Sequence, residues 1–333
     1  MPTLQDVANL ANVSTATVSR VLTGQTVHTE NKEKVEKAIK ELNYKPNTVA
    51  RNLRRKKSNL IIALMPDVKH QFYSEIIRGI EEEALKAGYN VLIGSNTFES
   101  DQELRHFELL EGSQADGIIV GTSQVKQELL EEVSKRKPVV LVNGHLTGSN
   151  IPSISIDNER ASYVMTKHLL QLQHKRIAHV MGPSNTMLAR ERLKGYKRAL
   201  REAGVEFDKE LVYEGDYFFH SGYEIGKRIL TVQETVDAIY STSDEMAIGI
   251  IRALTEKQIK IPQEISLVGF DDITISKYSY PSLTTIHHPR YEMGKKSFNL
   301  LLKLLNNKKI GKKHIFLEED LVVRESCGAA QST

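Results

Sequence analysis

The sequence predicts an α/β protein in which an N-terminal all-α helix-turn-helix domain precedes a two-lobed, doubly wound core. Two observations predict this organisation. The first 60 residues hold 11 Lys and Arg against 5 Asp and Glu, a net charge of +6 in a chain of net charge +3. From residue 59 onward, short apolar runs alternate with amphipathic stretches, which is typical of parallel strands joined by helices. At 333 residues the chain exceeds the usual size of one core, so we expect two or three domains.

Three short helices are expected within residues 1–45. Thr3 followed by Asp6 resembles a capping box and opens the first helix, after which Asn12 supplies a turn. Ser14 is a suitable N-cap for the second helix and Thr29 for the third. The third helix can brace the other two through apolar residues at helical spacing, namely Val35, Ala38, Ile39 and Leu42.

The second helix, within "NVSTATVSRVL", has a face of small polar residues that burial does not explain. If Val18, Val21 and Leu22 face the core, the opposite face carries small side chains and one arginine. Small side chains permit close approach to the major groove of DNA, and arginine can bind guanine through two hydrogen bonds. We therefore predict DNA contacts from Thr15, Ala16, Thr17, Ser19 and Arg20. An ordinary helical hairpin is the alternative, but it leaves the basic charge just downstream unexplained.

Residues 46–58, containing "NTVARNLRRKKSN", are predicted to form a hinge helix and linker. The helix is too short to be stable alone in water, so we expect it to fold on DNA. Leu53 would then wedge between base steps in the minor groove with Arg54 along it, and Asn47 and Ala50 complete the predicted DNA-binding set. A flexible basic linker is the alternative.

The remainder, residues 59–333, is predicted to be the ligand-binding core. Seven apolar runs predict buried parallel strands: "LIIALMPD", "NVLIGS", "GIIVG", "VVLVNG", "RIAHVMGP", "AIYSTSD" and "ISLVGFDD". Helix-like segments such as 74–87 separate them, which favours a doubly wound fold.

Three stretches resemble the lactose-repressor/galactose-repressor (LacI/GalR) family of bacterial transcription regulators: "TLQDVANLANVSTATVSRVLTG", "LNYKPNTVARNL" and "GFDDI". The resemblance covers essentially the whole chain, and "FYSEIIRGIE" and "PSLTTIHHPRYEMG" are most similar to the cytidine- and purine-repressor branches. It implies a homodimer or tetramer, a palindromic operator in double-stranded DNA, a sugar- or nucleoside-like effector, and a core similar to periplasmic binding proteins. It also implies crossings between lobes, giving an N-lobe of about 59–157 and 289–317 and a C-lobe of about 158–288 and 318–327.

Ligands of doubly wound sheets bind beyond the carboxyl ends of the strands. The candidate effector residues there are Phe72, Tyr73, Asn143, Arg192, Tyr217, Ser243, Asp244 and Asp271. A planar ring would stack on the aromatic residues while Arg192 and Asp271 bind hydroxyls or ring nitrogens. The resemblance implies effector positions at Phe72, Tyr73, Arg192, Tyr217 and Asp271.

For some of these residues a structural role is the alternative to effector binding. Tyr217 and Phe218 are alternatively core aromatics, and Asp244 is alternatively the N-cap of the helix "EMAIGIIRAL". The chain departs from the family pattern at "LVNG", where many members place an aspartate after the fourth strand.

Several classes of function are disfavoured by the sequence. It contains no Gly-rich dinucleotide motif, phosphate loop, Gly-x-Ser-x-Gly elbow or His-Glu-x-x-His, so we expect neither an enzyme nor a cofactor. Cys327 is the one cysteine, and the His287–His288 pair has no third ligand at short spacing, so no metal is expected. With no membrane span or export signal, a cytoplasmic protein is expected.

These observations together predict a DNA-binding regulator, most simply a repressor, of a metabolic operon. A small effector bound between the lobes would control it allosterically. One alternative is a catabolite-control-type regulator whose corepressor is a protein. A second alternative, from a different functional class, is a solute-binding protein, which the missing export signal disfavours.

Overall fold

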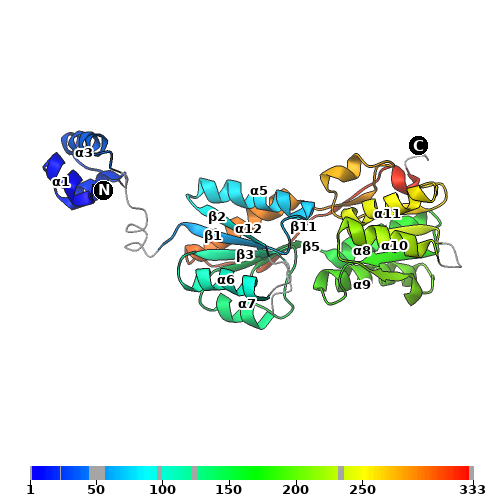
Figure 1. The fold of residues 1–333 in the computed structure, drawn as a ribbon. Coiled ribbons are helices and arrows are strands. Elements are labelled where there is room, and N and C mark those ends of the chain that lie inside the picture. The colour runs from blue at the N-terminus through cyan, green and yellow to red at the C-terminus, as the bar shows by residue number, and fades with distance from the viewer. Residues whose placement is uncertain are drawn as a thin grey trace. The chain divides into compact units, whose positions relative to one another are not determined.

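The computed structural model describes residues 2–22, 24–44, 57–95, 100–121, 127–231 and 236–329 (Figure 1). The chain divides into two compact units, Met1–Ser58 and Asn59–Thr333. No helix in these residues is long and apolar enough to cross a membrane.

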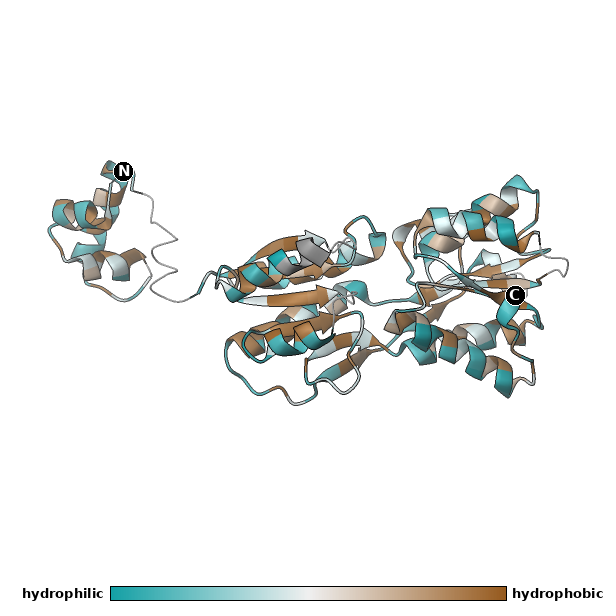
Figure 2. Cartoon of the chain, turned by 60° about the horizontal axis from the view of Figure 1, so that its bottom comes forward, coloured by the Kyte–Doolittle hydropathy of each residue, from teal (hydrophilic) through white to brown (hydrophobic). Residues whose placement is uncertain are grey.

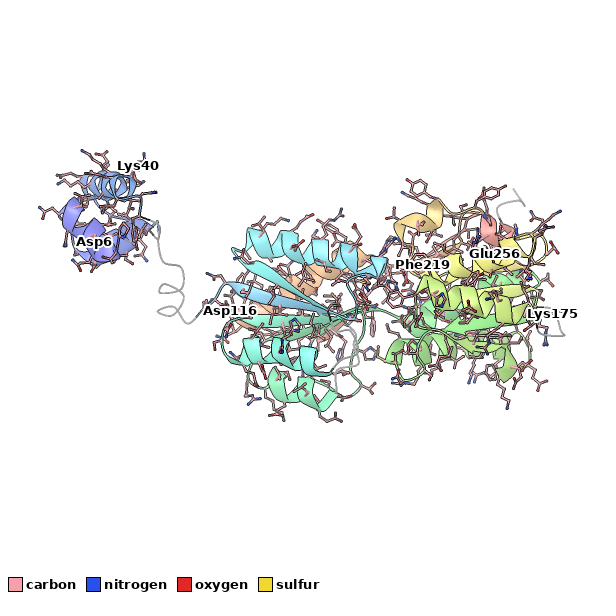
Figure 3. All side chains as sticks on the ribbon, viewed as in Figure 1. Asp6, Lys40, Asp116, Lys175, Phe219 and Glu256 are labelled. Carbon is pink, nitrogen blue, oxygen red and sulfur yellow. The ribbon has the colours of Figure 1, made fainter. Side chains whose placement is uncertain are left out.

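The N-terminal unit contains the three expected helices, α1 Leu4–Ala11, α2 Thr15–Leu22 and α3 Thr29–Glu41. The predicted capping box is confirmed, because the Asp6 carboxylate accepts the Thr3 N–H at 2.8 Å and the Thr3 hydroxyl accepts the Asp6 N–H at 3.3 Å (Figure 3). The turn at Asn12 is also confirmed, since this residue ends α1 with φ +50°, a conformation that asparagine tolerates.

The predicted N-cap is correct for α2 and wrong for α3. The Ser14 hydroxyl accepts the Thr17 N–H at 3.1 Å, which is the bond expected of an N-cap. The prediction that Thr29 caps α3 is wrong, because Thr29 is already helical and His28 is the cap residue, with no side-chain capping bond. The backbone carbonyl of His28 instead accepts the Lys32 N–H.

The core of this unit is small, and each helix contributes to it. Val7 of α1, Val18 of α2 and Val35 of α3 are fully buried and belong to one hydrophobic cluster. The helical spacing of apolar residues predicts this arrangement. Tyr44 joins this cluster at 8% exposure, a contribution the sequence did not predict.

The second unit is built on two sheets. The larger is six-stranded and all-parallel, with the order β11-β5-β4-β3-β1-β2. Its strands are β1 Leu60–Met65, β2 Asn90–Ser95, β3 Gly117–Gly121, β4 Val139–Val142, β5 Ser153–Ile156 and β11 His314–Leu317.

The smaller sheet is a four-stranded parallel sheet of order β7-β6-β8-β9, and a two-stranded antiparallel pair, β10-β12, accompanies it. These strands are β6 Ile177–Met181, β7 Val212–Glu214, β8 Ala238–Ser241, β9 Ser266–Val268, β10 Thr285–His287 and β12 Asp320–Val322.

Helices cover both sheets in layers. We call the six-stranded sheet with α5, α6, α7 and α12 the N-lobe, and the four-stranded sheet with α8 to α11 the C-lobe (Figure 1). The helices are α5 Gln71–Lys86, α6 Ser100–Glu111, α7 Gln127–Ser134, α8 Asn158–Gln171, α9 Met187–Glu202, α10 Phe219–Ile229, α11 Asp244–Glu256 and α12 Arg290–Leu305. Short 3₁₀ turns lie at Lys209–Leu211, Thr274–Lys277 and Glu325–Cys327.

All seven predicted apolar runs form strands, and the predicted fold class is confirmed. The prediction that all seven strands are buried is wrong for β2, which lies at the edge of the N-lobe sheet with Leu92 and Ile93 exposed. The strands are largely apolar, whereas the outer faces of the helices are polar (Figure 2). The sequence missed β5, β7, β10, β11 and β12, which are three or four residues long and carry polar residues at alternate or terminal positions. Runs this short give a weak periodic signal.

The predicted crossings of the chain between lobes remain an interpretation. Three observations agree with them: β11 pairs with β5 at the edge of the N-lobe sheet, α12 packs on α5, and β12 pairs with β10 beside the C-lobe.

Candidate functional site

The first candidate site is the outer face of α2. Ala16 and Arg20 are exposed, while Thr15, Thr17 and Ser19 are half-buried. Val18 is fully buried beneath them, which fixes the orientation of the helix on its own domain. The Thr17 hydroxyl lies 3.0 Å from the Ser14 hydroxyl, so part of its hydrogen-bonding capacity is used at the start of the helix. Ala16 and Arg20 therefore lie on the side of α2 away from Val18, whereas Thr17 and Ser19 flank Val18 and Thr15, three positions before it, lies on its side of the helix.

The four remaining DNA-contact predictions, Asn47, Ala50, Leu53 and Arg54, lie outside the described residues. They stay predictions from sequence.

The second candidate site lies between the carboxyl ends of the two parallel sheets. From the N-lobe, the first turn of α5 supplies Phe72 and Tyr73, both at least 93% buried, with ring centroids 5.1 Å apart at 87°. Burial raises the pKa of Tyr73, and a hydrogen bond from Asn143 opposes this rise. Asn143 follows β4 with φ +61°, which asparagine adopts more readily than most residues.

The C-lobe contributes Arg192 from α9, which is 2% exposed. Its Nε donates to Asn158 Oδ1 at 3.0 Å and its Nη1 donates to the Thr242 carbonyl at 2.6 Å. The guanidinium also lies 3.8 Å from the centre of the Phe270 ring. Because these contacts use two of its five N–H groups, the guanidinium is held in place while donors remain for a ligand.

Asp271 lies at the carboxyl end of β9 and is 4% exposed. Its Oδ1 is 3.2 Å from Nδ1 of His288, whose imidazole is fully buried. Burial lowers the pKa of His288 to about 4, so the ring is neutral at neutral pH. His288 also packs on Phe72 with ring centroids 5.0 Å apart, and thus links Asp271 to the N-lobe aromatic residue.

The structure brings four of the predicted effector residues together across the lobes. Tyr73 of the N-lobe lies within electrostatic range of Tyr217, Asp271 and Arg192 of the C-lobe. Tyr217 has φ +76°, and its ring packs so closely on Gly182 that any Cβ there would overlap it. Burial raises the pKa of Tyr217, which keeps the phenol neutral.

Ser243 and Asp244 are instead bonded within the C-lobe. The proposed N-cap role of Asp244 is wrong, because Ser243 is the cap of α11 and accepts the Met246 N–H at 3.1 Å. Ser243 also donates to the Tyr217 carbonyl at 2.8 Å. The cap lies one residue earlier than the proposed position because Asp244 is already helical.

The Asp244 carboxylate is fully buried and accepts three hydrogen bonds. The donors are the Ser276 and Thr285 hydroxyls, each at 2.6 Å, and the Ile273 N–H at 3.0 Å. Burial, and secondly the charge of Asp271, raise the pKa of Asp244 to about 7 against the effect of these bonds. Asp244 thus ties α11 to the segment that carries Asp271.

Sequence reasoning missed several residues that orient the cleft. Asn158 follows β5, a strand that was not predicted, and Phe270 stands inside the quoted "GFDDI" motif without having been assigned a role. His70 and Glu245, which meet between the lobes, follow predicted strands and were detectable by the same rule that found Tyr73.

The two neighbouring histidines each face an aspartate. His287 Nδ1 lies 2.8 Å from Asp272 Oδ2, and His288 faces Asp271 as described above. Throughout the part of the chain that the structure describes, no group of three or more His, Cys, Asp or Glu is arranged to hold a metal ion.

Two protein-family models match the chain. The model "Bacterial regulatory proteins, lacI family" matches residues 3–47, and "Periplasmic binding proteins and sugar binding domain of LacI family" matches residues 58–320. Between them they span both candidate sites.

Two curated relatives are similar along nearly their whole length. The chain is 36% identical over 326 residues to the HTH-type transcriptional regulator RegA of Clostridium saccharobutylicum, covering 97% of this chain and 98% of RegA. It is 35% identical over 329 residues to the HTH-type transcriptional repressor CytR of Escherichia coli strain K12, covering 98% of this chain and 96% of CytR.

Among solved structures, the lac repressor dimer bound to operator and the anti-inducer ONPF is similar to this chain with a TM-score of 0.89. The two are 29% identical, and the match covers 98% of this chain and 99% of that one.

Proposed function

The chain belongs to the LacI family of bacterial regulatory proteins, and we propose that it represses a metabolic operon in response to a small effector. It is a DNA-binding transcriptional regulator rather than an enzyme. In the proposed mechanism a homodimer binds a palindromic operator, and an effector in the interlobe cleft alters operator affinity.

The DNA-binding part of the proposal is supported by the outer face of α2. A helix of small polar side chains over a buried Val18 allows the backbone to approach the base edges closely. Arg20 is the longest side chain on this face and is exposed. The hinge residues Asn47, Ala50, Leu53 and Arg54 are proposed on sequence alone to contact the minor groove.

Substitution of Arg20 tests base recognition. Arg20→Ala should weaken operator binding by about 5- to 150-fold, corresponding to about 1–3 kcal/mol, and relax base preference at one position in each half-site. The measurement is a binding titration against operators varied one base pair at a time, at one fixed salt concentration. Lys37→Ala, which removes an exposed cation from α3, is the control and should keep the base preference. Equal weakening on every sequence would mean that Arg20 contacts phosphate instead.

The effector part of the proposal is supported by one observation above the others. The buried Tyr73 of the N-lobe lies within electrostatic range of the fixed Arg192 and the buried Asp271 of the C-lobe, and Phe72 packs on His288, which faces Asp271. We propose that a planar ring stacks on the Phe72, Tyr73 and Tyr217 side, and that Arg192 and Asp271 bind its polar groups. A nucleoside or sugar fits this combination, and Asn143 is a further polar contact. In this proposal Ser243 and Asp244 do not contact the effector. Their hydrogen bonds hold the segments that carry Tyr217 and Asp271.

A screen by thermal unfolding identifies the effector class. A ligand at 100 times its Kd adds about 2.7 kcal/mol to the stability of the folded state, so nucleosides, purines, pentoses, hexoses and disaccharides can be ranked by the rise in Tm. A protein corepressor is favoured if none of them raises Tm.

The ligand that the screen finds can then test Asp271. This residue has φ +118°, where alanine is strained, so Asp271→Asn is the suitable variant. Loss of the charged acceptor should weaken effector binding by about 10- to 150-fold and leave operator binding unchanged. Isothermal titration and operator titration measure the two effects, with Asp320→Asn, an exposed site, as the control. Unchanged effector affinity would place the pocket elsewhere.

The homodimer is supported by exposed aromatic residues on the C-lobe. Tyr280 is 91% exposed and Tyr278 is 74% exposed, and both follow the exposed Ile275 within five residues of the chain. Large exposed apolar side chains that gather in one place are typical of protein interfaces.

A further inference from the structure

Two His–Glu pairs lie between the N-lobe and the C-lobe. His70 Nδ1 lies 3.4 Å from Glu245 Oε1, and His145 Nε2 lies 3.7 Å from Glu191 Oε1. In each pair the histidine follows the carboxyl end of an N-lobe strand, β1 or β4, and the glutamate stands near the start of a C-lobe helix, α11 or α9. The two pairs therefore connect different strands of one lobe to different helices of the other.

Glu245 is the more deeply buried of the two glutamates, with 1% of its surface exposed. Its Oε1 accepts the Gln71 N–H at 2.9 Å, and Gln71 is the first residue of α5 in the opposite lobe. Glu245 itself stands in the first turn of α11. One carboxylate thus lies at the N-terminal ends of two helices from different lobes, where unpaired N–H groups and the helix dipoles favour negative charge.

The neighbourhood of His70 supports this contact from both lobes. Its Nδ1 accepts the Phe72 N–H at 3.2 Å, which makes the Gln71 N–H the principal donor to Glu245. The Phe218 ring of the C-lobe lies 5.4 Å from the His70 ring. Side chains of both lobes fill this region beside the labelled Phe219 (Figure 3).

The second pair is more open to solvent. The side chains of His145 and Glu191 are 22% and 27% exposed, against 9% and 2% for His70 and Glu245. His145 is held against the N-lobe by the rings of His314 and Phe316, 5.8 Å and 5.9 Å away. Burial lowers the pKa of His145 below its usual value, so its ring is neutral at neutral pH and does not form an ion pair with Glu191. The contribution of Glu191 is therefore expected to be the smaller.

We propose that Glu245, with Glu191 as a weaker second point, forms a latch that holds the two lobes together. Separating the lobes breaks the hydrogen bond from the Gln71 N–H and removes the carboxylate from the end of α5. The latch therefore favours the closed arrangement before any effector binds. Its consequence for regulation depends on the function proposed above: an effector that selects the closed arrangement binds more tightly when the latch has already populated it.

The interlobe distance in the full-length protein tests the latch. Spin labels on Lys135→Cys in the N-lobe and Lys209→Cys in the C-lobe report this distance by double electron–electron resonance, and both positions are exposed. Mixing labelled chains with excess unlabelled chains removes distances between subunits. Neither DNA nor effector is added, so failure of operator binding or of the ligand screen leaves this test intact.

Glu245→Gln should raise the longer-distance population about tenfold over the parent, the factor expected when a hydrogen bond to a charged group is lost. Glu191→Gln should raise it less, and the double variant should raise it most. Glu111→Gln, which breaks the 2.6 Å Arg136–Glu111 pair within the N-lobe, is the matched control and should leave the distances unchanged. An unchanged distribution in a folded double variant overturns the proposal.

Gln71→Pro tests the same contact from the other lobe. Proline is well tolerated as the first residue of a helix, and it removes the N–H together with the exposed Gln71 side chain. His70 already has the extended conformation that a following proline requires. Gln71→Pro should separate the lobes as Glu245→Gln does, and combining the two should add little. Full additivity of the two substitutions would contradict the shared contact.

Discussion

The His179→Leu variant is expected to be more stable than the parent protein, and the difference is expected to grow as the pH falls. His179 is fully buried in β6, stacked on Tyr196 at 4.6 Å with Tyr240 at 5.0 Å. Neither ring nitrogen has a hydrogen-bond partner among the described residues. An unsatisfied buried polar group costs about 1–3 kcal/mol, and the lost ring stacking offsets about 0.5–1.5 kcal/mol. A gain of about 1 kcal/mol is therefore expected at pH 7.5.

The pH dependence follows from the depressed pKa of this histidine. Burial lowers the pKa of His179 from 6.5 to about 3, so the unfolded chain binds a proton at a pH where the folded chain does not. The parent therefore loses stability as the pH falls from 6.5 towards 3, by about 1.4 kcal/mol per pH unit. At pH 5 this adds about 2 kcal/mol to the advantage of the leucine variant.

Urea unfolding followed by circular dichroism at pH 7.5 and pH 5 measures both effects. His220→Leu, at an exposed position of α10 in the same lobe, is the control and should show no growing advantage at low pH. A constant difference between parent and His179→Leu at the two pH values would contradict the prediction.

Gly294→Val is expected to destabilise the N-lobe by about 3 kcal/mol. Gly294 of α12 lies where that helix crosses α5, and a Cβ there would overlap the Ile76 carbonyl oxygen. Gly79 of α5 meets the Tyr291 carbonyl in the same way, so two glycines allow the backbones to touch. Backbone atoms cannot rotate aside as a flexible side chain can, and the helices must therefore move apart. Since α5 carries Phe72 and Tyr73, effector binding should also weaken.

The same urea titration gives the loss of stability. Gly311→Val is the control, because no atom lies within 4 Å of a Cβ at that exposed glycine and its φ is not positive. If Gly294→Val unfolds at the same urea concentration as the control, the close crossing is not what holds α5 and α12 together.

Much of the fold could be predicted from local sequence. The Thr3–Asp6 capping box, the turn at Asn12 and the buried Val18 are decided by neighbours within a few residues, and the structure has each of them. Six of the seven apolar runs form buried strands, because parallel strands covered on both faces need unbroken apolar sequence, and the seventh, β2, lies at a sheet edge. The strand "SISI" of β5 escaped notice because its serines are buried at a sheet position that only its partner strands create.

The candidate site could be predicted from the sequence only in part. The rule that ligands bind beyond strand ends found Tyr73, Arg192 and Asp271, but it also selected Ser243 and Asp244, whose hydrogen bonds are within the C-lobe. Local sequence does not distinguish a polar side chain that faces a cleft from one that ties two segments of the same lobe together.

The sequence by itself determined the helix-turn-helix, the alternation of strands and helices, and the residue types at the strand ends, since these depend on propensity and periodicity over short windows. The tertiary structure decided which of those residues meet: Arg192 with Asn158 and Phe270, Asp271 with His288, and Glu245 with the first N–H of α5. These partners are separated by up to 174 positions in the chain, and only the packing of two sheets and their helices brings them into contact.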